Sequence, residues 1–120
     1  MNDVFDLPSS MARLGGDREL FETLVRFYRE DSPGLLEQIR TGFARNDAKL
    51  VERGGHSLKG LVASFSADGA RDAADRVAES ARQGDLPSAR ESFSELEIEV
   101  RRLDGALASY LERAGSNIRA

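Results

Sequence analysis

The chain has 120 residues, of which 40% are hydrophobic, and a formal net charge of −4 at pH 7. This length suits one domain over residues 1–120, and the net acidity argues against a nucleic-acid-binding protein, which would carry a basic stripe. No cysteine is present, which excludes disulfides and thiol chemistry and favours the cytoplasm as the location.

The first expected element is a short helix near the amino terminus. Leu7, Met11 and Leu14 are spaced as on one helical face, and Gly15-Gly16 should end the helix. The residues before it lack the basic start and apolar centre of a secretory signal. Because no apolar run in the chain is long enough to span a bilayer, we expect no membrane insertion.

Two further helices are expected between residues 17 and 45. Asp17 is placed to cap the first of them. The apolar face of this helix contains Leu20, Leu24, Phe27 and Tyr28. Ser32-Pro33 has the pattern of a cap followed by a first-turn proline, which predicts the start of a new helix. The apolar face of that helix contains Leu36, Ile39 and Phe43.

The next two expected helices differ in the residues of their apolar faces: the first has mainly branched and aromatic residues, and the second mainly alanine. Asn46-Asp47 supplies the cap of the first one. Its apolar positions are Leu50, Val51, Leu58, Val62 and Phe65. The second helix, over residues 67–83, is rich in alanine, and a face of small side chains lets a neighbouring helix approach closely. That face contains Ala70, Ala73, Ala74, Val77 and Ala81.

The last helix has the clearest periodicity in the chain. Gly84-Asp85 ends the preceding helix, and Pro87 lies in the first turn of this one. Its apolar seam is Phe93, Leu96, Val100, Leu103, Leu107 and Tyr110. Short connections make neighbouring helices antiparallel. We therefore predict an all-α, antiparallel four-helix bundle with a short additional helix before it, a core over residues 7–113 and a frayed tail at residues 114–120.

The most informative segment surrounds His56, the only histidine in the chain. On a helical wheel, the buried face is defined by Val51, Leu58, Val62 and Phe65. His56 lies roughly 150° from the centre of that face. The imidazole should therefore face solvent. Imidazole is largely unprotonated at neutral pH, so one ring nitrogen is free to attack a phosphoryl group.

Two small residues lie on the same side of the helix as His56. Gly60 and Ala63 leave a nearly smooth surface beside the imidazole. A mid-helix glycine costs about 1 kcal/mol relative to alanine, so Gly60 needs a reason. Close helix packing is one reason, and it fits Gly54 and Gly55, which fall towards the core. Because Gly60 lies almost opposite the core, we favour access for a docking partner.

Charged residues are expected close to the imidazole on α-helical spacing grounds. Lys59 follows His56 by three positions, and its ammonium is placed to neutralise a phosphoryl group held on the ring. A carboxylate is expected to orient the other ring nitrogen. Glu52, four positions earlier on the same helix, is one candidate, and Asp72 and Asp75 on the following helix are others.

The segment His56-Ser57-Leu58-Lys59-Gly60 matches the H-x-[LI]-K-G motif of the histidine phosphotransfer (HPt) domains of bacterial and eukaryotic phosphorelays. The turns expected at residues 14–17, 31–33, 46–47 and 84–85 also fall where that family has turns, so the sequence resembles HPt domains over residues 7–113. Two positions depart from the pattern: Ser66 stands where many members have glycine, and Ala70 where many have leucine.

This resemblance implies a phosphorelay carrier. His56 would accept a phosphoryl group from a receiver-domain aspartate and donate it to another receiver, Lys59 would balance the phosphoryl charge, and Gly60 would give the receiver access. The implied partners are response-regulator receiver domains and a hybrid sensor histidine kinase, and we expect a monomer. The sequence contains no nucleotide-binding loop and no acidic set that suits a metal. We expect a carrier without enzyme activity or cofactor of its own, with Mg²⁺ on the partner receiver.

Three alternatives are open at this point. A non-phosphorylated helical adaptor would keep the bundle and bind a signalling partner without phosphoryl traffic. A histidine kinase fragment or a metal hydrolase would be an enzyme, although a single histidine and no cysteine make a metal site improbable. The chain is also consistent with the phosphotransfer domain of a larger hybrid sensor kinase.

Overall fold

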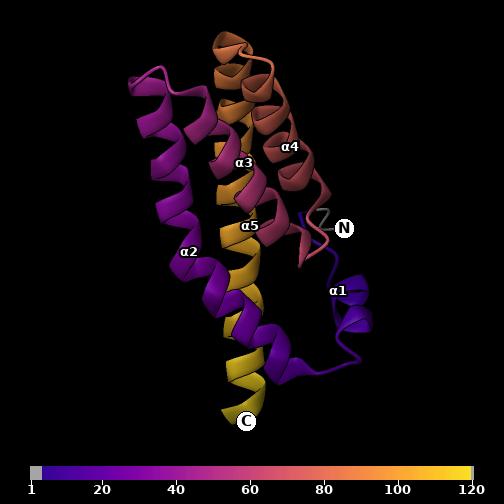
Figure 1. Ribbon diagram of the computed structural model, residues 1–120. Coiled ribbons are helices and arrows are strands. Elements are labelled where there is room, and N and C mark those ends of the chain that lie inside the picture. Colours follow the sequence, from indigo (N-terminus) through magenta and orange to yellow (C-terminus); the bar gives the residue numbers. More distant parts are fainter. Residues whose placement is uncertain (1–3, 120) are drawn as a thin grey trace.

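The computed structural model describes residues 4–119, with side chains described as far as Arg113. Over these residues the chain forms the helices α1 (Leu7–Arg13), α2 (Arg18–Ala44), α3 (Ala48–Ala63), α4 (Asp68–Arg82) and α5 (Leu86–Arg119). The four long helices run up and down in turn, and α1 lies to one side of the lower part of the bundle (Figure 1). The prediction of an all-α four-helix bundle with a short additional helix is confirmed.

Four aspartate side chains fix where helices begin. Each accepts a hydrogen bond from the backbone N–H three residues later, which satisfies an amide that has no partner inside the helix. These residues are Asp6, Asp17, Asp47 and Asp85. The predicted caps at Asp17 and Asp47 are confirmed, with N···O distances of 3.0 and 3.1 Å.

The predicted helix boundary at Ser32-Pro33 is wrong, because Pro33 lies inside the continuous helix α2. An internal proline removes one helical hydrogen bond and bends the helix, and α2 changes direction along its length (Figure 1). Burial explains why the helix continues. Tyr28, Ser32 and Ile39, on both sides of the proline, are buried against the rest of the bundle, and this packing outweighs the local cost of about 3 kcal/mol.

The apolar face predicted for the first half of α2 is also partly wrong. Leu20 and Phe27 are 41% and 50% exposed, whereas Phe21 and Val25 are buried together with the correctly predicted Tyr28. Both sets of residues are spaced as on one helical face, so periodicity cannot choose between them. Aromatic neighbours elsewhere in the bundle decide which face is buried: the Phe21 ring lies 5.7 Å from Phe65, in the turn after α3, and 5.2 Å from Tyr110 on α5, edge to face.

The core faces predicted for the later helices are confirmed. The apolar seam of α5 and the alanine-rich face of α4 are buried, as are most of the apolar positions expected on the histidine-bearing segment. On that segment the buried residues are Val51, Leu58, Val62 and Phe65. Within residues 4–119, every helix lacks the combination of length and apolar character needed to cross a bilayer.

Two adjacent glycines let α3 approach its neighbours closely, as the sequence predicts. A β-carbon on Gly54 would lie 2.6 Å from Cγ1 of Ile39 on α2. A β-carbon on Gly55 would lie 3.1 Å from the backbone nitrogen of Ala78 and 3.2 Å from the carbonyl oxygen of Ala74, both on α4. Helix α3 therefore packs between α2 and α4 so closely that a larger residue at either glycine would require its neighbours to shift.

Helix α1 is tied to the turn between α3 and α4. The Arg13 guanidinium donates hydrogen bonds to the carbonyl oxygen of Ala63, at 3.1 Å, and to the Ser66 hydroxyl. The backbone N–H of Asp6 donates to the carbonyl oxygen of Phe65 at 3.0 Å. Ser66 has φ of 52°, a left-handed conformation that favours glycine, which accounts for the glycine that many HPt domains have there.

At the carboxyl end, helix α5 continues to Arg119. Residues 114–119, where we expect a frayed tail, therefore have helical backbone in the structure. The α5 hydrogen-bonding pattern simply continues past the last buried seam residue, Tyr110. Ala120, the last residue of the expected tail, lies outside the described residues.

The packing of α3 can be tested with two matched glycine substitutions. Gly54→Ala should lower the free energy of unfolding by about 1–3 kcal/mol, because its β-carbon would overlap the fully buried Ile39. Gly105→Ala on α5 is the control: nothing lies within 4 Å of its β-carbon, so alanine should raise the free energy of unfolding by about 1 kcal/mol. Urea denaturation measures both. A Gly54→Ala protein as stable as the Gly105→Ala protein would contradict the close packing of α3 on α2.

Candidate functional site

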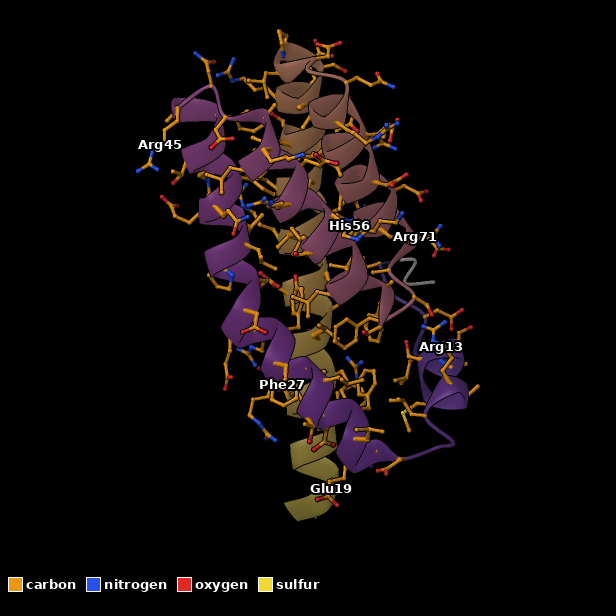
Figure 2. The ribbon with its side chains drawn as sticks, in the orientation of Figure 1. Arg13, Glu19, Phe27, Arg45, His56 and Arg71 are labelled. Atoms are coloured by element: carbon orange, nitrogen blue, oxygen red, sulfur yellow. The ribbon has the colours of Figure 1, made fainter. Side chains whose placement is uncertain are left out.

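His56 lies on α3, on the outer surface of the bundle. Its side chain is exposed, whereas Val51, Leu58 and Val62 on the opposite side of the same helix are buried, as the helical wheel predicts. Figure 2 shows the imidazole on the α3 surface towards α4. No hydrogen bond to it occurs among the residues whose side chains are described. The ring nitrogens are therefore open to a reactant that comes from solvent.

Lys59 is paired with a carboxylate from the next helix. Its Nζ lies 2.9 Å from Oδ1 of Asp75 on α4, and both side chains are substantially exposed, at 39% and 57%. The hydrogen bond from Lys59 lowers the pKa of the Asp75 carboxyl, and the charges of Lys59, Arg71 and His56 contribute further, against an opposing effect of burial. Asp75 thus lies within electrostatic reach of both His56 and Lys59.

Gly60 has no packing role in the fold. It is exposed, and a β-carbon added to it would meet nothing within 4 Å. This environment is the opposite of that of Gly54 and Gly55, which touch neighbouring helices. Ala63, one turn further along α3, is half-buried, and its carbonyl oxygen accepts the hydrogen bond from Arg13. The absence of a side chain at Gly60 therefore keeps the surface beside His56 open without helping the bundle to pack.

The structure does not bring Glu52 into contact with the imidazole. Glu52 is half-buried on α3, and in the described part of the chain it makes no hydrogen bond or ion pair. Its charge acts instead on Arg82 of α4, where it adds to the larger effect of Glu79 in raising the pKa of that guanidinium. The expected role of Glu52 in orienting the imidazole stays a prediction.

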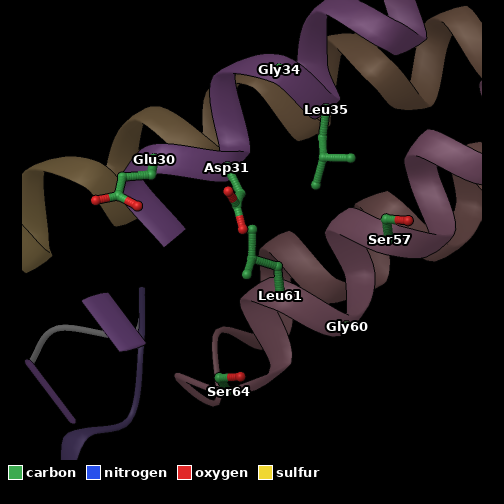
Figure 3. Close-up of a pocket in the computed structure, with 8 residues that line it drawn as sticks. All are labelled: Glu30, Asp31, Gly34, Leu35, Ser57, Gly60, Leu61 and Ser64. Carbon is green, nitrogen blue, oxygen red and sulfur yellow. The ribbon is translucent and has the colours of Figure 1, made fainter. Parts of the chain in front are cut away.

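A shallow groove of about 690 Å³ runs beside this site, between α2 and α3. Figure 3 shows that residues of both helices line it. They are Glu30, Asp31, Gly34, Leu35, Ser57, Gly60, Leu61 and Ser64. Sequence reasoning missed the half of the groove that α2 contributes. The periodicity of α2 places these residues on a helix surface, but only the packing of α2 on α3 shows that they adjoin the surface next to His56.

Comparison with known families gives a match to the Hpt domain over residues 23–106, which is more than half of the chain. The chain belongs to the Hpt domain family. This confirms the resemblance inferred from the sequence. No curated protein and no solved structure matches the chain in the corresponding comparisons.

Membership in the family gives this domain its general role. Hpt domains are histidine phosphocarriers of phosphorelays, and they interact with receiver domains and kinases. The match begins within α2 and ends within α5, so it contains His56, Lys59 and Gly60 together with the α2 side of the groove. Helix α1 lies outside the matched range.

The Lys59–Asp75 pair of this Hpt domain can be tested by titration. Lys59→Gln should raise the pKa of the Asp75 carboxyl towards its ordinary value, because the hydrogen bond that lowers it would be lost. Carbon-13 NMR of the carboxyl groups over the acidic pH range measures this shift. The pKa of Asp6, lowered mainly by hydrogen bonds from Ser9, should stay the same in both proteins. An unchanged Asp75 pKa would show that the pair does not form in solution.

Proposed function

We propose that His56 is the phosphorylated residue of this Hpt domain, which accepts a phosphoryl group from one receiver domain and donates it to another. The observation that carries this proposal is that the only histidine of the chain lies exposed on α3, with an open surface around it. Nothing in the described structure has to move before a partner reaches the ring.

The proposed reaction uses the imidazole as a nucleophile. A ring nitrogen of His56 attacks the phosphorus of an aspartyl phosphate in line, an N–P bond forms, and the O–P bond to the receiver aspartate breaks, with its electron pair leaving on the carboxylate. Transfer to the second receiver is the reverse step. We expect Mg²⁺ bound to the receiver to stabilise the moving phosphoryl group, since such transfers depend on electrostatic stabilisation and usually on a metal.

Lys59 is the cation of this chain that we propose for balancing phosphoryl charge. It follows His56 by less than one helical turn, and among the residues whose side chains are described only Asp75 engages it, through one of its three N–H donors. An ammonium on a flexible side chain can turn towards a new anion, because the existing ion pair is exposed to water.

The groove between α2 and α3 is where we propose that the receiver docks. Its α3 side includes Gly60, and its α2 side includes Leu35, which offers apolar contact. Glu30 and Asp31 make the α2 side of the groove acidic, which favours a receiver surface with basic residues at the matching position. A receiver placed here would cover Gly60 and bring its active site over His56. A hybrid sensor histidine kinase, the other expected partner, would present its receiver in the same way.

The assignment of His56 is tested by labelling. A phosphorylated receiver domain incubated with the wild-type chain should transfer acid-labile label to it, and the His56→Gln protein should take none while remaining folded by circular dichroism. Incubation with ATP alone should label neither protein, since we expect no kinase activity. Acid-labile label on the His56→Gln protein would overturn the assignment. Failure to label the wild type, with unchanged signalling by the variant, would instead favour the helical adaptor.

The access role of Gly60 is tested by adding an uncharged side chain. Gly60→Gln should slow transfer from the receiver by about tenfold or more, equivalent to about 1.4 kcal/mol of activation free energy, because the side chain blocks close approach. Stability should not fall, because a β-carbon at Gly60 meets nothing within 4 Å. Gly105→Gln, at an equally open position on α5, should transfer at the wild-type rate. Equal rates for the two variants would exclude an access role.

A further inference from the structure

The feature behind this inference is that Lys59, three positions after His56 on α3, is already paired with a carboxylate of α4. Because Gly55 lets the α3 backbone pack against Ala74 and Ala78, the α4 residue between them, Asp75, comes beside the histidine-bearing surface. Its Oδ1 lies 2.9 Å from Nζ of Lys59. The charge of His56 also contributes to the shifted titration of Asp75, so the carboxylate and the imidazole interact electrostatically.

The other acidic residues of α4 pair with arginines of α4 itself, whereas Asp75 pairs with a lysine of α3. Asp72 and Asp68 are paired with Arg71, at 3.1 and 3.9 Å. Glu79 is paired with Arg82 on its own helix. Among the residues whose side chains are described, Asp75 alone pairs with Lys59.

A phosphoryl group on His56 would change this balance of charge. It brings roughly −1.5 to −2 elementary charges to a site where Lys59 and Asp75 now neutralise each other. Lys59 carries a single positive charge, so it cannot neutralise both anions. If Lys59 stays with Asp75, the phosphoryl group loses Lys59 as a counter-ion. If Lys59 turns to the phosphoryl group, Asp75 is left unpaired and repels it. Either arrangement raises the free energy of the phosphorylated protein relative to one without Asp75.

We propose that Asp75 is a positioning residue that holds Lys59 and thereby weakens the hold of His56 on the phosphoryl group, which favours onward transfer. This inference rests on the proposed function of His56. In the step concerned, the N–P bond of phosphohistidine breaks with its electron pair left on the ring nitrogen, and an O–P bond forms to the receiver aspartate. Asp75 does not touch the reacting atoms; it acts through Lys59.

The test measures how the phosphoryl group distributes at equilibrium between the chain and a receiver domain. Asp75→Asn should shift this equilibrium towards phosphohistidine by about threefold or more, because Lys59 is then free to pair with the phosphoryl group. Glu95→Gln is the matched control. It removes the same charge and another exposed ion pair between helices, with Arg76 at 2.6 Å, without involving Lys59. Its equilibrium should equal that of the wild type.

A second pair of variants isolates the action through Lys59. In a Lys59→Gln background, Asp75→Asn should shift the equilibrium much less than it does in the wild type, since there is no ammonium to release. An equal shift in both backgrounds, or no shift in the wild-type background, would overturn the proposal. Thermal unfolding of each variant checks that folding is kept. If the wild-type chain takes no label from any receiver, the proposed function itself fails, and this inference fails with it.

Discussion

The close approach of α3 to the two helices on either side of it is the constraint on which the rest of the structure depends. Gly54 meets Ile39 of α2, and Gly55 meets the backbone of Ala74 and Ala78 on α4, at distances that leave no room for a β-carbon without rearrangement. Small residues make this contact possible, but they bury little apolar area. The bulk of the core therefore comes from the aromatic and branched residues of the other helices and of the α3 core face.

This packing determines which face of α3 is exposed to solvent. With one face of α3 committed to the core by Val51, Leu58 and Val62, the opposite face must meet solvent, and it carries His56 and Gly60. A reactive side chain on a packed helix is held more firmly than one on a loop. The resulting surface is open to solvent, which suits the phosphocarrier role of Hpt domains.

The charges around His56 fit a carrier better than a permanent phosphate site. A site built to retain a phosphoryl group would aim several unengaged donors at it. Here Lys59 is engaged by Asp75 and Arg71 of α4 by its own acidic neighbours, whereas Arg53, three positions before His56, makes no ion pair in the described part of the chain. A phosphocarrier has to release the phosphoryl group as readily as it accepts it. The pairing of Lys59 and Arg71 with acidic residues is consistent with this requirement.

The sequence by itself determined the helical class, the caps at Asp17 and Asp47, the core faces of α4 and α5, and the outward orientation of His56. These features follow from local periodicity and capping chemistry, which act within one helix. Two errors in α2 show the limit of such reasoning. Local pattern favoured a break at Pro33 and an apolar face that includes Phe27, but burial against other helices kept α2 continuous and turned Phe21 inward.

Only the tertiary structure decided which groups from different helices share the site. The groove joins α2 residues to the surface beside Gly60, and the contact of α3 with α4 selects Asp75 as the partner of Lys59. The sequence offered Glu52, Asp72 and Asp75 as carboxylates near the imidazole without a way to rank them. The physical reason is that periodicity gives the face of a helix on which a residue lies, whereas the distance between two helices depends on every side chain packed between them.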